Sequence, residues 1–139
     1  MLSLETAKRL KEAGLEWEPQ NYDFYVMTIF EIPLITCMSD KWTVKSVRKD
    51  VLEFGDERRV WLPRLDQILA HIEKLGYWLF LWGTANGRYC VELIKHHADG
   101  YGSKCIDFFY NESLEEAAAE ALLWILREGN KHEKELQHV

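Results

Sequence analysis

The segment YWLFLWGTANGRYCVELIKHH, residues 77–97, constrains the fold more than any other part of the chain. Its apolar residues repeat with a period of two around the dipeptide Asn86-Gly87, which is typical of tight hairpin turns. The pattern predicts a strand over 77–83, a turn and a second strand over 88–97. KCIDFFY, residues 104–110, is expected to add a third strand.

The first of these strands is apolar on both faces. Trp78, Phe80 and Trp82 point one way, whereas Leu79 and Leu81 point the other. Such a strand needs cover on both faces, from helices or from a partner chain. We expect Trp78 and Trp82 to stay partly exposed, and they are the candidate ligand-binding or interface residues because large amphipathic rings serve both roles.

Three helices are predicted from their end signals. The first covers residues 3–13, between a Ser cap and a Gly stop. The second begins at Pro63, which suits a first helical position, and ends at Gly76. The third, SLEEAAAEALLWILREG at 113–129, opens with an S-x-x-E capping box, and its alanines allow close approach to a sheet.

Residues 16–62 give weaker signals. We expect a strand in DFYVMTIFEI, residues 23–32, and a short strand in ERRVWLP, residues 57–63. The segment 41–54 fits either a helix or a strand. The predicted order is therefore α, two or three strands, α, β-β-β, α.

Length and composition favour one folded domain. The 139 residues are 47% hydrophobic, which is enough to bury a core. We predict an α+β single domain over residues 1–129, with a mainly antiparallel sheet covered by helices, and a polar tail over 130–139. No apolar run reaches the ~20 residues of a membrane span and no signal peptide opens the chain, so a cytoplasmic protein is expected.

Reactive residues are few and dispersed. The weak metal candidates are Cys90 and His96, on one face of a strand, and Cys105 on the next strand, but the C-x₂-C and H-x₃₋₅-H spacings of zinc sites are missing. No cofactor and no catalytic residue is assigned, because there is no G-x-S-x-G motif and the carboxylates are scattered. Cys37 could act as a nucleophile, although a buried structural role is the commoner one.

Residues 63–128 carry a first resemblance to a known family. Their α-β-β-β-α order and the helix EEAAAEALLWIL are similar to the double-stranded RNA-binding domain. That resemblance implies RNA binding through Lys residues at the start of the last helix, where this chain has Glu112, Glu115 and Glu116. With a net charge of −6 as well, electrostatic repulsion disfavours nucleic acid as a partner.

Two further resemblances concern shorter motifs. SLEEAAAEAL resembles the helix start that follows the sheet in HicB-type antitoxins, which implies a fold order but no matched binding residue. LSLETAKRLKEAGLEWEP, WLPRLDQILAHIEKLGY and EEAAAEALLWILRE resemble segments of short uncharacterised proteins from phages and prophages of Gram-positive bacteria. This likeness spans most of the chain and implies an origin rather than an activity.

Together these observations favour a non-enzymatic protein of phage or prophage type that acts by contact with another protein or with itself. A homodimer through the hairpin or its Trp face is expected. The alternatives are a nucleic-acid-associated module and a metal- or thiol-dependent enzyme.

Overall fold

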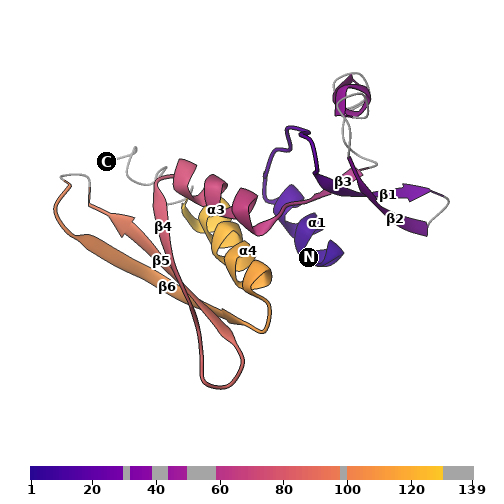
Figure 1. Ribbon diagram of the computed structural model, residues 1–139. Helices are drawn as coiled ribbons and strands as arrows, with labels where there is room; N and C mark the ends of the chain where they lie inside the picture. Colours follow the sequence, from indigo (N-terminus) through magenta and orange to yellow (C-terminus); the bar gives the residue numbers. More distant parts are fainter. Residues whose placement is uncertain (30–31, 39–43, 50–58, 98–99, 130–139) are drawn as a thin grey trace. The chain divides into compact units, whose positions relative to one another are not determined.

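The computed structural model shows an α+β protein with two antiparallel sheets (Figure 1). It describes residues 1–29, 32–38, 44–49, 59–97 and 100–129. The chain divides into two compact units, Met1–Arg64 and Leu65–Val139. The predicted α+β class and the antiparallel pairing are confirmed. The described strands form two separate three-stranded sheets instead of the one sheet that was predicted. The single domain over 1–129 stays a prediction, and the predicted tail over 130–139 lies outside the described residues.

The first unit contains one three-stranded sheet with strand order β2-β1-β3. Its elements are α1 (Leu4–Glu12), β1 (Phe24–Ile29), β2 (Ile32–Cys37), a helical segment at 44–49 and β3 (Arg59–Leu62). The single strand predicted over 23–32 is wrong, because β1 ends at Ile29 and β2 begins at Ile32, its antiparallel partner. Apolar residues stand on both sides of this reversal in the sequence, and no Gly or Asn signals a turn. The strand-like apolar pattern therefore runs through it and predicts one strand instead of two.

Helix α1 begins and ends as its sequence predicts. The Ser3 hydroxyl accepts a hydrogen bond from the Thr6 N–H at 3.2 Å. At the other end Gly14 adopts a φ of +101°, and the Leu15 N–H donates to the Leu10 carbonyl at 3.0 Å. These bonds satisfy backbone groups that a helix end otherwise leaves open.

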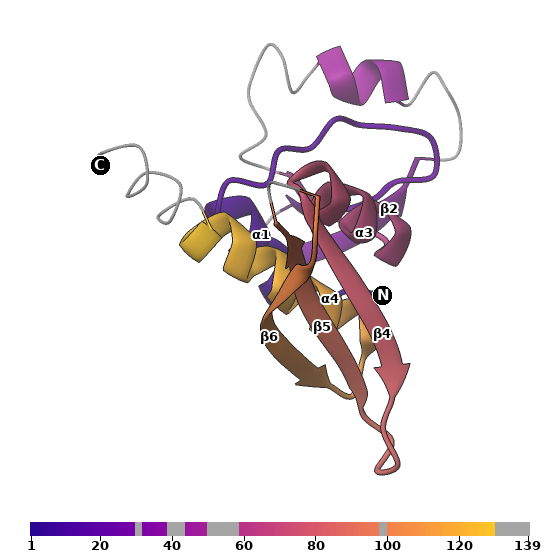
Figure 2. The same ribbon diagram turned by 90° about the vertical axis from the view of Figure 1, so that its left-hand side faces the viewer.

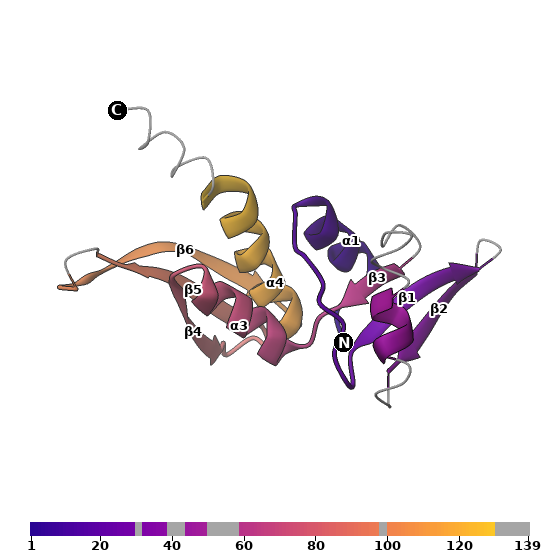
Figure 3. The same cartoon turned by 90° about the horizontal axis from the view of Figure 1, so that it is seen from above.

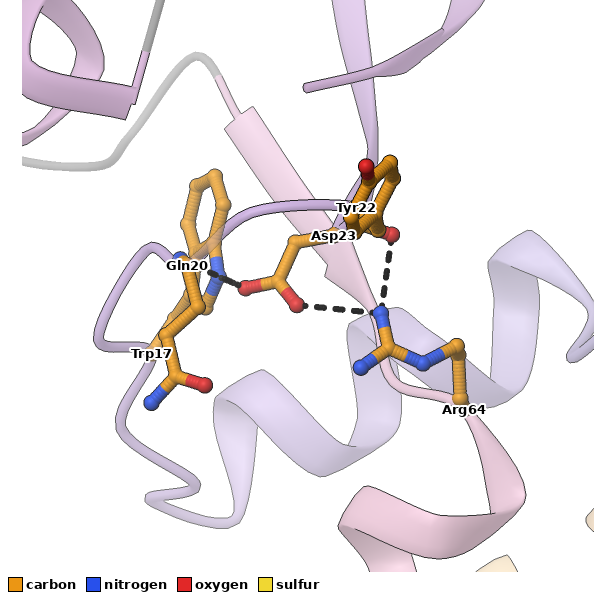
Figure 4. Close-up of polar contacts among 5 residues, drawn as sticks. All are labelled: Trp17, Gln20, Tyr22, Asp23 and Arg64. Atoms are coloured by element: carbon orange, nitrogen blue, oxygen red, sulfur yellow. Dashed lines mark hydrogen bonds and ion pairs between the residues drawn. The ribbon is translucent and has the colours of Figure 1, made fainter. Parts of the chain in front are cut away.

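A buried carboxylate, Asp23, ties together the loop after α1 (Figure 4). Its Oδ2 accepts hydrogen bonds from the Trp17 indole N–H at 2.9 Å and the Gln20 backbone N–H at 3.0 Å. The Arg64 guanidinium pairs with Oδ1 at 3.3 Å and also donates to the Tyr22 carbonyl at 2.8 Å. A buried charge needs such partners, so Asp23 is an organising residue of the first unit.

The second unit has the order helix, three strands, helix. Its elements are α3 (Leu65–Lys74), β4 (Tyr77–Gly83), β5 (Tyr89–His96), β6 (Ser103–Asn111) and α4 (Leu114–Trp124), which continues as a π-helical turn over Ile125–Gly129. The sheet order is β4-β5-β6, so the predicted hairpin and third strand are confirmed. Pro63 as the first helical residue is wrong: β3 extends to Leu62, and α3 begins only at Leu65.

Both helices of the second unit lie on the same side of the β4-β5-β6 sheet, as Figure 2 shows with the strands in front of α4. Val91 and Leu93 of β5 are fully buried on this side. The alanines of α4 are also fully buried, together with Leu122, which confirms the predicted close approach of this helix to a sheet.

Ser113 caps the start of α4, but the reciprocal half of the predicted capping box is wrong, because the Ser113 N–H donates to Asn111 Oδ1 at 3.0 Å rather than to Glu116. The Ser113 hydroxyl accepts from the Glu116 N–H at 3.3 Å. A hydrogen bond from its own backbone N–H lowers the pKa of Glu115, aided by the Ser113 hydroxyl. Figure 3 shows α4 beside the sheet from a third direction. None of the described helices is long and apolar enough to cross a membrane.

Candidate functional site

The side of the β4-β5-β6 sheet opposite α3 and α4 carries five exposed aromatic side chains. We call this surface the aromatic face; its members are Trp78, Phe80 and Trp82 of β4 and Phe108 and Tyr110 of β6. Their exposed fractions run from 41% for Trp82 to 61% for Phe80. Figure 2 looks onto this side of the sheet.

Strand register explains why these five residues share one face. Phe80 of β4 and Phe108 of β6 lie opposite the same β5 residue, Glu92. Trp82 and Tyr110 likewise lie opposite Cys90. Because side chains alternate along a strand, every second residue of the three strands contributes to the face.

Aromatic rings bridge the central strand. The ring centroids of Trp82 and Phe108 are 6.3 Å apart at an interplanar angle of 72°, an edge-to-face contact between the two outer strands. Between these strands Cys90 has no exposed surface, whereas Glu92 stays half-buried. The centre of the face therefore offers one carboxylate among aromatic rings.

The expected exposure of Trp78 and Trp82 is confirmed, at 57% and 41%. Among the described elements, helices cover only the opposite face of β4, so cover by a partner chain stays a prediction. Sequence reasoning did not single out Phe108 and Tyr110. Their two-residue spacing in DFFY was the available signal, but strand register was needed to place them beside the β4 aromatics.

The weak metal candidates occupy different surroundings. Cys90 is buried beside Tyr110, and Cys105 is exposed beside Glu92. His96 makes an edge-to-face contact with Trp78 at 5.0 Å between ring centroids. In the described ranges no three His, Cys, Asp or Glu side chains are grouped so that they could hold a metal ion.

Thiol chemistry is disfavoured at the exposed face. Desolvation, a hydrogen bond to Glu92 and the charges of Glu92 and Asp107 raise the pKa of the Cys105 thiol. The hydrogen bond with Cys90 raises the pKa of the Tyr110 phenol. A raised thiol pKa lowers the thiolate fraction at neutral pH, the opposite of what a nucleophile needs. Cys37 is exposed on β2, so the buried role expected for it is wrong.

Alkylation of Cys105 is expected to be slow at neutral pH. Its rate should rise with pH around a midpoint above that of the same residue in the urea-unfolded chain, because desolvation, Glu92 and Asp107 raise the pKa of the thiol. Peptide mass spectrometry after timed iodoacetamide labelling measures this. The Glu92→Gln variant should lower the midpoint; equal midpoints in the folded and unfolded chain would contradict the assignment.

The first unit contains a small hollow. It is lined by Ala7, Lys11, Leu15, Trp17, Arg59 and Trp61, and its volume of about 10 Å³ has room for about one water molecule. The Lys11 ammonium crosses to the Arg59 carbonyl at 2.8 Å. Pockets for small molecules are typically larger, about 300–1,000 Å³, so the aromatic face is the stronger candidate.

Comparisons with protein-family models, curated proteins and solved structures found no match to this chain. The case for function therefore rests on the chemistry of the aromatic face.

Proposed function

We propose that this protein is a non-enzymatic interaction module that binds another protein through the aromatic face. The observation that carries the proposal is the exposure of five aromatic side chains on one face of a sheet whose other face is packed under helices. Aromatic residues are enriched among those that contribute most to protein binding.

The exposed apolar area supports this reading. An aromatic side chain buries roughly 150–250 Å² when enclosed. With about half of each ring exposed, the five residues offer about 500 Å² of apolar surface, near the upper limit of what monomeric proteins leave open. Patches of this size mark interaction sites more often than they serve the fold alone.

The charge at the centre of the face suggests the chemistry of the partner. Glu92 is half-buried between Phe80 and Phe108, where a carboxylate and aromatic rings together attract a cation. The net charge of −6 acts in the same direction. We therefore expect an apolar partner surface that places a Lys or Arg side chain over Glu92.

The remaining parts of the proposal concern origin, compartment and catalysis. The three free cysteines suit a reducing cytoplasm. The likeness of three segments to phage and prophage proteins supports such an origin. The separation of Cys90, His96 and Cys105 into different surroundings supports binding over metal- or thiol-dependent catalysis.

A nucleic-acid-associated role is the second candidate. The order α3-β4-β5-β6-α4, with both helices on one side of the sheet, favours it because double-stranded RNA-binding domains are built in that order. The acidic start of α4, with Glu115 and Glu116 in its first turn, opposes it because phosphate backbones are repelled there.

Two designed helical peptides test the proposed function. Both share the same leucines, and their polar positions are all Lys in one and all Glu in the other. Anisotropy of the labelled peptides, titrated with full-length protein, should show binding of the basic peptide and at least about tenfold weaker binding of the acidic one. The same titration with an RNA duplex should show no binding at micromolar protein.

Variants locate the binding surface. Phe108→Ala should weaken binding of the basic peptide about tenfold, and Glu92→Gln should reduce the preference for the basic peptide. Tyr101→Ala is the matched control, since Tyr101 is an 83% exposed aromatic residue outside the aromatic face. Equal losses in all three variants, absence of peptide binding, or binding of the duplex in preference would overturn the proposal.

A further inference from the structure

Within the described part of the chain, the outer edge of β4 carries none of the charges, prolines or bulges that usually protect an exposed strand edge. β4 is the first strand in the order β4-β5-β6, and no described strand pairs with its outer side. Its register with β5 is continuous over all seven residues, YWLFLWG, which include no charge and no Pro. Proteins normally blunt exposed edges with charges, prolines or bulges, because a bare edge is a template for another strand.

The opposite edge of the same sheet shows the contrast. Strand β6 has a register shift opposite Leu93 and Ile94, and it carries exposed Lys104 and Asp107. A bulge and charges of this kind prevent a second strand from pairing regularly. Only the β4 edge of this sheet is therefore suited to strand addition.

Backbone direction along β4 allows such pairing. The Thr84 N–H donates to the Arg88 carbonyl at 2.7 Å. The backbone hydrogen-bonding groups of Thr84 therefore point toward the β5 side of the hairpin. Hydrogen-bonded and non-bonded pairs alternate in an antiparallel ladder, and the register from Tyr77 to Gly83 has no shift. The N–H and C=O groups of Leu79 and Leu81 therefore face away from β5, toward the outer edge.

The side chains of β4 are arranged symmetrically along the strand. The sequence WLFLW, residues 78–82, is a palindrome centred on Phe80. A two-fold axis at Phe80 would place Trp78 opposite Trp82 of a second copy, and Leu79 opposite Leu81. Aromatic pairs would then meet on one face and leucine pairs on the other, which stabilises antiparallel neighbours. In the same register Leu79 lies opposite Leu81 of the second copy. Both residues direct their backbone N–H and C=O groups away from β5, so these groups can exchange hydrogen bonds across the interface.

We propose that two copies of this chain pair antiparallel through the β4 edges, with the two-fold axis at Phe80. The two three-stranded sheets then form one six-stranded sheet, and the two aromatic faces become continuous on one side of it. Such an interface is isologous and closed, so the expected assembly is a dimer. This inference goes beyond the proposed function, because it uses the edge of β4 and leaves the face open for a partner.

Light scattering coupled to size-exclusion chromatography gives the primary test on the full-length protein. The mass should rise toward twice the chain mass of 16.4 kDa as protein concentration increases from about 1 μM to about 100 μM. A mass of one chain at every concentration would overturn the inference. It would leave the peptide-binding proposal standing, because that is judged by the peptide titration.

A proline substitution isolates the backbone contribution. Leu81→Pro removes the outward-facing N–H, a change that edge strands tolerate because no bond to β5 depends on that donor. It should raise the dimer dissociation constant at least about tenfold, whereas Leu81→Ala, which keeps the N–H, should raise it less. Circular dichroism confirms that each variant is folded. Equal effects of the two substitutions would contradict strand pairing.

A matched pair of charge substitutions separates edge pairing from face-to-face packing. Phe80→Lys places like charges against each other at the two-fold axis and should abolish the dimer. Phe108→Lys changes a residue opposite the same Glu92 but on β6, and the dimer should persist. Loss of the dimer in both variants would overturn edge pairing in favour of packing through the aromatic faces.

Discussion

Replacing Leu93 by Ala should lower the free energy of unfolding by about 3 kcal/mol, because it deletes buried methyl groups and leaves a cavity. Leu93 is fully buried on the side of the sheet that α3 and α4 cover. Helix α4 packs against β5, and its alanines are fully buried, so this close-packed layer has little freedom to close the gap. Urea unfolding followed by circular dichroism measures the loss.

Phe80→Ala is the control for this experiment. Phe80 lies on the same sheet and is larger than Leu93, yet 61% of it is exposed. At about 1 μM protein, where the proposed dimer is dissociated, its removal should cost less than about 1 kcal/mol, because little apolar surface returns to water. If the loss equalled that of Leu93→Ala, the aromatic face would be part of the core and the binding proposal would lose its main support.

Replacing Asp23 by Ala should destabilise the first unit by about 2–3 kcal/mol, because it removes a buried charged acceptor of several hydrogen bonds. The substitution removes the acceptor for the Trp17 indole N–H and the Gln20 N–H, and it leaves the Arg64 guanidinium without its carboxylate. Loss of hydrogen bonds to a charged acceptor accounts for much of the cost. Hydrogen exchange of the β1 amides reports the loss within this unit.

Two further substitutions make the Asp23 experiment specific. Asp23→Asn keeps one acceptor oxygen and loses the charge opposite Arg64, so it should lie between Asp23→Ala and the unmodified protein. Glu18→Ala removes an exposed carboxylate from the same loop and should stay within about 0.5 kcal/mol. A loss for Asp23→Ala no greater than that for Glu18→Ala would show that the buried cluster does not organise the loop.

The elements predicted well are those with local signals. Ser3 and Ser113 cap α1 and α4, and the hairpin around Asn86-Gly87 has the expected strands. Capping bonds and turn conformations involve residues a few positions apart, so the residue types alone reveal them. The reversal between β1 and β2 lacked such a signal, and it was missed.

The candidate site was only half predictable. The period of two placed Trp78 and Trp82 on one face of β4. Their partial exposure was predicted because large amphipathic rings suit contact with a partner or ligand, and the structure confirms that exposure. The addition of Phe108 and Tyr110 required the register of β6 against β5, which includes a shift that no sequence pattern announces.

The amino-acid sequence by itself determined the three helices that carry end signals, the hairpin and the palindrome centred on Phe80, because short-range hydrogen bonding and side-chain period depend on neighbouring residues. Only the tertiary structure decided which face of β4 stays open. Both faces of that strand are apolar, and the choice depends on where α3 and α4 pack, which is set by contacts between residues far apart in the chain.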